Sequence, residues 1–225
     1  IGHFYAIEVY LSEQEKKLKP KSTLDFFYGL FNQASISNMQ LFTMWKRLVH
    51  FLPWGQYAYF VDWLNRKLPG FEDHVISVQQ QSKDHLDHSI NDNPKSQLYF
   101  YQPTFVSSLL LSTSPHFQFN PQEIENGENA LKKMGLSQNA PFVCFHARDS
   151  AYLKELYPHL NMSYHDYRDS NIHNYLLAAK ELVNRDYFAI RVGSIANPLV
   201  TTHDKIIDYA NQFHTDLMDL YLAYK

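Results

Sequence analysis

Cysteine is almost absent from this chain of 225 residues, because Cys144 is the single one. No disulfide can therefore form within the chain, which indicates either a reducing compartment or no dependence on the compartment. Glycine is scarce as well, with 7 residues beside 10 prolines, so collagen-like and low-complexity proteins are excluded. No uninterrupted apolar run reaches the length of about 18 residues that marks a membrane-spanning helix. The sequence therefore predicts no transmembrane segment.

An excess of basic residues is also missing. Lys and Arg number 20 against 23 Asp and Glu, which gives a net charge of −3. Since proteins bind DNA and RNA by neutralising phosphates, we expect no nucleic-acid partner. Hydrophobic residues make up 45% and charged residues 19%, which is typical of a folded globular protein. The length suits one large domain or two small ones.

Common catalytic motifs are missing too: the sequence has no G-x-S-x-G, no P-loop and no G-x-G-x-x-G. The run Asp84–His88 offers carboxylate and imidazole ligands, but it lacks a third ligand at a spacing that suits zinc. We therefore expect neither a metal nor a cofactor. Cys144 stands inside an apolar run, and we interpret it as a small core residue rather than a nucleophile.

The first part of the chain is predicted to be mostly helical. Apolar side chains recur at helical spacing over three segments, residues 3–14, 38–51 and 56–68. A clearer helix follows, in which Asn120 and Glu123 form a capping-box pattern and Gly135 suits the position after the last turn. The polar stretch 137–140 then predicts a hinge. We place the boundary there, with an amino-terminal, mostly helical lobe over 1–136 and a second lobe over 137–225.

Beyond this hinge the hydrophobic pattern changes. Residues 142–145 form an apolar run of buried-strand length, 171–183 an amphipathic helix, and 187–192 a second strand. Ile206 begins a third unit. Strands that alternate with helices predict βαβ units with a parallel sheet, and therefore an α/β fold.

Charged side chains follow the first of these strands. His146 and Arg148 alternate with Ala147, so both can face one side, while Asp149 or Ser150 can cap a helix that begins near residue 151. Parallel sheets bind ligands beyond the carboxyl ends of their strands. An arginine beside a helix N-terminus would suit an anion there. The alternative is a capped turn whose arginine is only solvated.

The second strand ends in the same way, with Arg191 followed by Gly193 and Ser194. Two arginines at one sheet edge favour a phosphate or diphosphate ligand, although an ion pair would explain Arg191 as well. Between the strands, Arg168 and Asp169 either contact the ligand or form a local salt-bridge network.

Taken in order, these segments resemble a family of bacterial glycosyltransferases that is associated with surface-polysaccharide and lipopolysaccharide gene clusters. The resemblance is dense over 115–225 and sparse before it. Its motifs are Phe145-His146-Ala147-Arg148-Asp149-Ser150-Ala151-Tyr152-Leu153, Tyr167-Arg168-Asp169-Ser170-Asn171-Ile172, Tyr175-Leu176, Ile190-Arg191-Val192-Gly193 and Ile206-Ile207-Asp208-Tyr209-Ala210, with Gly2-His3 near the start.

The resemblance implies a GT-B-like architecture, in which two Rossmann-like lobes face a cleft. His146 and Arg148 are also similar to the His-x-Arg motif of fucosyltransferases, whose arginine contacts the nucleotide diphosphate. Asp149 stands where that pattern usually has a second arginine, so the donor sugar need not be fucose. Both ends of the chain look cut. We therefore expect a fragment in which the carboxyl-terminal lobe is incomplete.

The implied function is transfer of a sugar from a nucleotide-sugar donor to a glycan or lipid-linked glycan acceptor. We expect a metal-independent reaction, in the cytoplasm or with peripheral contact at the inner face of its membrane. Arg148 would stabilise the diphosphate, with His146, Asp149, Arg168, Asp169, Arg191, Gly193 and Ser194 around the donor. His3 would be the base or an acceptor ligand, unless it is a buried structural histidine. The alternatives are a noncatalytic carbohydrate- or nucleotide-binding module and a structural interaction protein.

Overall fold

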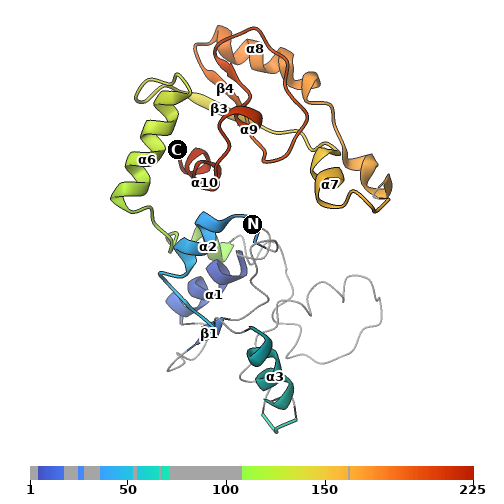
Figure 1. Cartoon of the computed structure of the whole chain (residues 1–225). Helices are drawn as coiled ribbons and strands as arrows, with labels where there is room; N and C mark the ends of the chain where they lie inside the picture. Colours follow the sequence, from blue (N-terminus) through green and yellow to red (C-terminus); the bar gives the residue numbers. More distant parts are fainter. Residues whose placement is uncertain are drawn as a thin grey trace. The chain divides into compact units, whose positions relative to one another are not determined.

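The computed structural model divides the chain into two compact units, Ile1–Gln118 and Phe119–Lys225 (Figure 1). It describes residues 5–17, 25–27, 36–52, 55–65, 67–70, 108–161 and 163–225. His3 and the run Asp84–His88 lie outside these ranges. Within the described ranges, no helix is both long enough and apolar enough to cross a membrane.

The first unit is mostly helical in its described part. Its elements are α1 (Tyr5–Glu15), β1 (Phe26–Phe27), α2 (Met39–Trp45), β2 (His50–Phe51) and α3 (Gly55–Asn65). The helix expected over 38–51 is shorter, because α2 ends at Trp45 and the chain turns into β2, which pairs in parallel with β1. Trp45 is buried, and its ring lies 5.5 Å from that of Phe117.

The second unit is built on a three-stranded parallel sheet. Its strands are β3 (Phe142–Phe145), β4 (Phe188–Arg191) and β5 (Ile206–Ile207), in the order β3-β4-β5. The helices between β3 and β4 are α7 (Ala151–Leu156), the 3-10 helices η3 (Ser163–Arg168) and η4 (Ile172–Tyr175), and α8 (Leu176–Asn184). The predicted βαβ pattern and the α/β class are therefore confirmed.

Alternating side chains of the central strand bind helices to both faces of this sheet. Ala189 packs in one cluster with Ala179 of α8, while Ile190 packs in another with Leu131 and Tyr221. These last two belong to α6 (Pro121–Lys133) and α10 (Asp216–Tyr224). Successive strand residues point to opposite faces, so the pattern produces three layers (Figure 1).

Helix α6 begins and ends as its sequence predicts. The Asn120 side chain accepts a hydrogen bond from Glu123 N, the Glu123 side chain accepts one from Asn120 N, and Gly135 follows with a φ of 86°. The helix nevertheless belongs to the second unit, because Gly127 faces the ring of Tyr221. The first unit ends at Gln118 and the second begins at Phe119, earlier in the chain than the boundary expected at 136–137.

The expectation that β3 is fully buried is wrong. Phe142 and Phe145 pack against the two clusters, but Val143 and Cys144 are exposed. The reason is the strand order, since β4 has a partner on each side while β3, in the described sheet, pairs with β4 alone. Interpreting Cys144 as a core residue is therefore wrong as well. Neighbouring atoms still desolvate its thiol and raise the pKa of Cys144.

Candidate functional site

The loops that follow β3 and β4 leave the sheet side by side. Phe145 pairs with Arg191, so the residues after each strand lie at the same carboxyl edge. His146 Nδ1 lies 3.1 Å from the carbonyl oxygen of Val192 and joins the two loops. Gly193 has a φ of 151°, and a Cβ added there would lie 3.9 Å from His146 Nδ1. This edge is where parallel sheets place ligands.

Arg191 is buried in this edge, with 0% of its side chain exposed. Its Nη1 lies 3.1 Å from Oδ1 of Asp208, and its Nη2 lies 3.5 Å from Oδ2 of Asp149. A guanidinium without access to water needs such counter-charges, since an isolated buried charge is very unfavourable. Arg191 therefore has the ion-pair role that the sequence left open, and it does not face solvent.

The two carboxylates beside Arg191 hold the loops in place. Asp149 accepts hydrogen bonds of 2.9 Å from the amides of Ala151 and Asn197. It caps α7 in this way, as one of the two capping residues that the sequence suggested, while Ser150 makes no side-chain cap.

Asp208 holds the chain segments on either side of β5 in a similar way. The sequence analysis did not identify it as a site residue. Its Oδ2 accepts hydrogen bonds from Leu199 N at 2.9 Å and from Asn211 Nδ2 at 2.8 Å. A signal was available, because Asp208 directly follows the apolar pair of β5 and so reaches the same sheet edge as the acid after β3. One buried guanidinium and two carboxylates thus connect three loops.

Arg148 differs from Arg191 in being accessible. Its side chain is 28% exposed, and its Nε lies 3.5 Å from Oδ1 of Asp169. An ion pair of that length near solvent is weak. The backbone of Arg148 is held more strongly than its side chain, because its carbonyl oxygen accepts a 2.8 Å hydrogen bond from Ser170 N. A guanidinium carries five N–H donors in a fixed fork, so Arg148 has donors left for a ligand.

An open pocket of about 380 Å³ has Asp149, the residue that follows Arg148, in its wall. It is lined by Asp149, Ser170, Asn171, Ile172, His173 and Asn197. The Asn171 side chain accepts a 3.0 Å hydrogen bond from His173 N and so caps η4. The volume falls within the range of about 300–1,000 Å³ that is usual for small-molecule sites. The sequence analysis did not assign Asn171, His173 or Asn197, because their proximity depends on the fold.

The remaining predicted residues are dispersed along the same loops. Arg168 ends η3 with an exposed side chain, and Ser194 is exposed after β4.

A separate polar cluster is formed by His214, Asp216 and Asp219, whose possible ligand atoms all lie within 4.8 Å of one another. Asp219 is already engaged there, because it accepts a 2.8 Å hydrogen bond from Tyr209 Oη and lies 3.1 Å from His214 Nε2.

Comparison of this chain with protein-family models, with curated proteins and with solved structures finds no match.

Proposed function

We propose that this chain is part of a glycosyltransferase that transfers a sugar from a nucleotide-sugar donor to a surface-glycan acceptor. The observation that carries the proposal is Arg148, an accessible guanidinium at the carboxyl edge of a parallel sheet, directly before Asp149, which lines an open pocket. In this proposal the second unit is the first part of a Rossmann-like, donor-binding lobe of a GT-B-like enzyme. The reaction takes place in the cytoplasm.

The proposed step is displacement at the anomeric carbon. The bond from that carbon to the diphosphate oxygen breaks, a bond to an acceptor oxygen forms, and the acceptor proton passes to a base. Negative charge grows on the departing diphosphate, so donors that are already in position stabilise the transition state most. Arg148 supplies such donors without a metal, and its fork matches two phosphate oxygens. His3, which lies outside the described residues, stays a prediction from the sequence alone.

The other residues of the edge have positioning roles in this proposal. Arg191 and Asp149 hold the loop that carries Arg148, because their ion pair joins the end of β4 to the residues after β3. His146 and Gly193 keep the two loops together, and Asp169 orients the Arg148 side chain. Arg168 and Ser194 are the exposed polar groups from which further donor contacts are proposed.

Substitution of Arg148 in the full-length protein tests the proposal, in an assay of sugar transfer from a panel of nucleotide-sugars. We expect Arg148→Ala to lower the transfer rate about a hundredfold, which corresponds to about 3 kcal/mol of lost transition-state stabilisation. The midpoint of thermal unfolding should stay near that of the wild type, since the Arg148 ion pair is weak. Arg148→Lys should not restore the rate, because an ammonium cannot grip two oxygens.

Arg185→Ala is the matched control. Arg185 is an exposed arginine directly after α8, and it pairs with Glu181 of that helix. Its loss should therefore change neither the transfer rate nor the stability. Equal rates for wild type and Arg148→Ala would refute the diphosphate role, and so would unfolding of that variant. Tight binding of a nucleotide-sugar with no transfer or hydrolysis would instead favour a noncatalytic binding module.

A further inference from the structure

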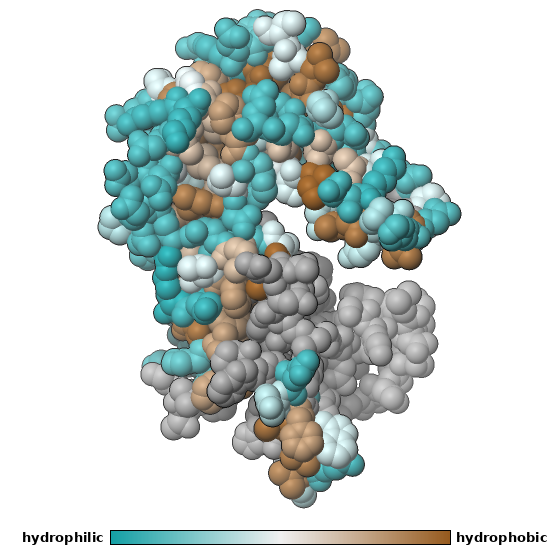
Figure 2. All heavy atoms as spheres, viewed as in Figure 1, coloured by the Kyte–Doolittle hydropathy of each residue, from teal (hydrophilic) through white to brown (hydrophobic). Residues whose placement is uncertain are grey.

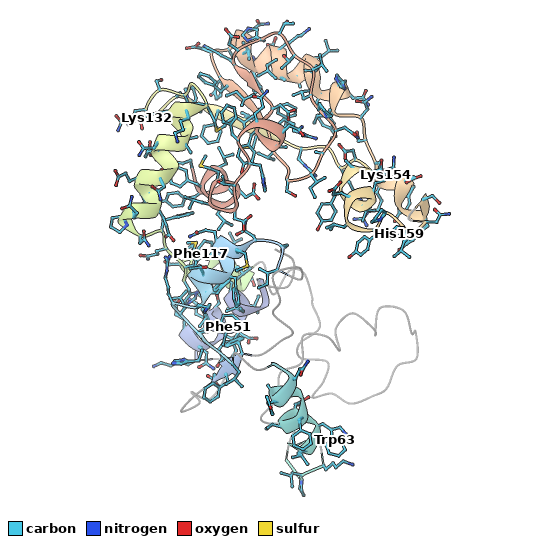
Figure 3. The ribbon with its side chains drawn as sticks, viewed as in Figure 1. Phe51, Trp63, Phe117, Lys132, Lys154 and His159 are labelled. Carbon is cyan, nitrogen blue, oxygen red and sulfur yellow. The ribbon has the colours of Figure 1, made fainter. Side chains whose placement is uncertain are left out.

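Helix α3 turns its apolar side toward solvent. Its exposed apolar residues, here called the aromatic face, are Tyr57, Phe60, Val61, Trp63, Leu64 and Leu68, the last of them just beyond the helix. Tyr57 is 72% exposed, Phe60 57% and Trp63 53%. Figure 3 labels Trp63 on this helix, and Figure 2 shows brown, hydrophobic side chains on its surface.

The spacing of these residues is that of a single helical stripe. Within the helix, residues 57, 60, 61 and 64 recur at intervals of three and four, which places them on one side. Ala58 and Asp62, four residues apart on the other side, are buried and half-buried. A surface helix ordinarily buries its apolar stripe and exposes its polar one, so α3 has the reverse arrangement. A contiguous exposed apolar stripe of this kind marks an interaction surface.

Aromatic rings and a lysine lie together on this surface. The rings of Phe60 and Trp63 stack with centroids 6.1 Å apart, and Lys67 Nζ lies 4.8 Å from the centroid of the Trp63 ring. Tryptophan and tyrosine favour the boundary between lipid headgroups and acyl chains. A lysine can keep its ammonium among the headgroups while its methylene stem lies against apolar groups.

The sequence segment that contains α3 has a charge opposite to that of the whole chain. Segment 46–68 has a net charge of +3, whereas the chain has −3. The basic residues of the segment are Lys46, Arg47, Arg66 and Lys67, and Asp62 is its single acid. Basic residues beside an apolar helical face are attracted to anionic lipids. Lys67 lies over the Trp63 ring at this face, so pairing of two copies of the face would bring two lysines together.

We propose that α3 lies flat in the interface of an anionic lipid bilayer, with its aromatic face among the upper acyl chains. The helix has 11 residues and is about 16 Å long, which is too short to cross a hydrocarbon core of about 30 Å. The contact is therefore peripheral, and the first unit makes it. This inference does not rest on the donor site of the second unit.

Vesicle sedimentation with the full chain tests the inference. We expect the chain to bind vesicles of phosphatidylcholine with phosphatidylglycerol, and to bind pure phosphatidylcholine vesicles much more weakly. The triple variant Phe60→Ser, Trp63→Ser, Leu64→Ser should bind the anionic vesicles with an affinity at least about tenfold lower than that of the wild type. Lys67→Glu should also weaken binding, and added salt should weaken it for the wild type.

The control replaces three exposed apolar residues of the second unit, Leu160→Ser, Leu177→Ser and Val200→Ser, which are 61%, 81% and 73% exposed. It should bind like the wild type, and both triple variants should keep their circular dichroism spectrum because no buried side chain is changed. Equal binding by wild type and the α3 variant would overturn the inference, as would no binding to either vesicle. A dimer in sedimentation equilibrium that the α3 variant abolishes would assign the face to a second copy instead.

Discussion

Removing the guanidinium of Arg191 should destabilise the second unit strongly. Arg191→Met would leave Asp208, 4% exposed, and Asp149, 11% exposed, close together without their shared counter-charge. Removal of one partner from a buried ion pair costs about 3–5 kcal/mol in the free energy of unfolding. Asp208 keeps its hydrogen bonds from Leu199 N and Asn211, so we expect the lower end of that range, about 3 kcal/mol. The thermal midpoint should fall by about 12–24 °C.

A double-mutant cycle separates the ion pair from a simple loss of packing. Asp208→Asn alone leaves the buried Arg191 with Asp149 as its single described counter-ion, and should cost about 2 kcal/mol. Combining Arg191→Met with Asp208→Asn removes both charges together. The loss of unfolding free energy in the double variant should therefore be smaller than the sum of the two single losses by about 1–3 kcal/mol.

Urea unfolding of the full chain, followed by circular dichroism, measures these free energies. Arg185→Met is the control, because its ion pair with Glu181 is exposed and should contribute less than about 1 kcal/mol. Strict additivity in the cycle, or a loss below about 1 kcal/mol for Arg191→Met, would refute the reasoning. The Arg191 ion pair would then not be what stabilises this edge of the sheet.

Three further outcomes are expected. Gly127→Ala should cost about 1–3 kcal/mol in urea unfolding, because the added Cβ would lie 2.6 Å from the ring of Tyr221. Asn120→Ala should cost about 1 kcal/mol in the same assay through loss of the cap on Glu123 N, and Asn120→Asp should keep most of it. The alkylation rate of Cys144 by iodoacetamide should be low at neutral pH and rise until well above the ordinary thiol pKa, because desolvation raises the pKa of this exposed residue. A rate that levels off at or below the ordinary pKa would contradict that shift.

Signals that act over a few residues were readable from the sequence. Asn120 and Glu123 exchange their capping hydrogen bonds across three residues, and Gly135 follows the same helix at its end. The strands at 142–145 and 188–191 formed where apolar runs of strand length occur. The carboxyl-edge positions of Arg148 and Arg191 followed from those strands. Each of these features depends on local backbone preference, or on the alternation of side chains along one strand.

Features that join distant parts of the chain required the tertiary structure. Arg191 is buried because Asp208, which follows another strand, lies beside it once β4 and β5 pair. Cys144 is exposed because β3 has β4 as its one partner in the described sheet, and α6 belongs to the second unit because Gly127 packs on Tyr221. The sequence by itself determined that α6 forms between its caps and that strands form near 142 and 188, but not that α2 ends at Trp45 and leads into β2. Burial and charge pairing are properties of neighbours in space, so the fold alone decided which arginine faces solvent.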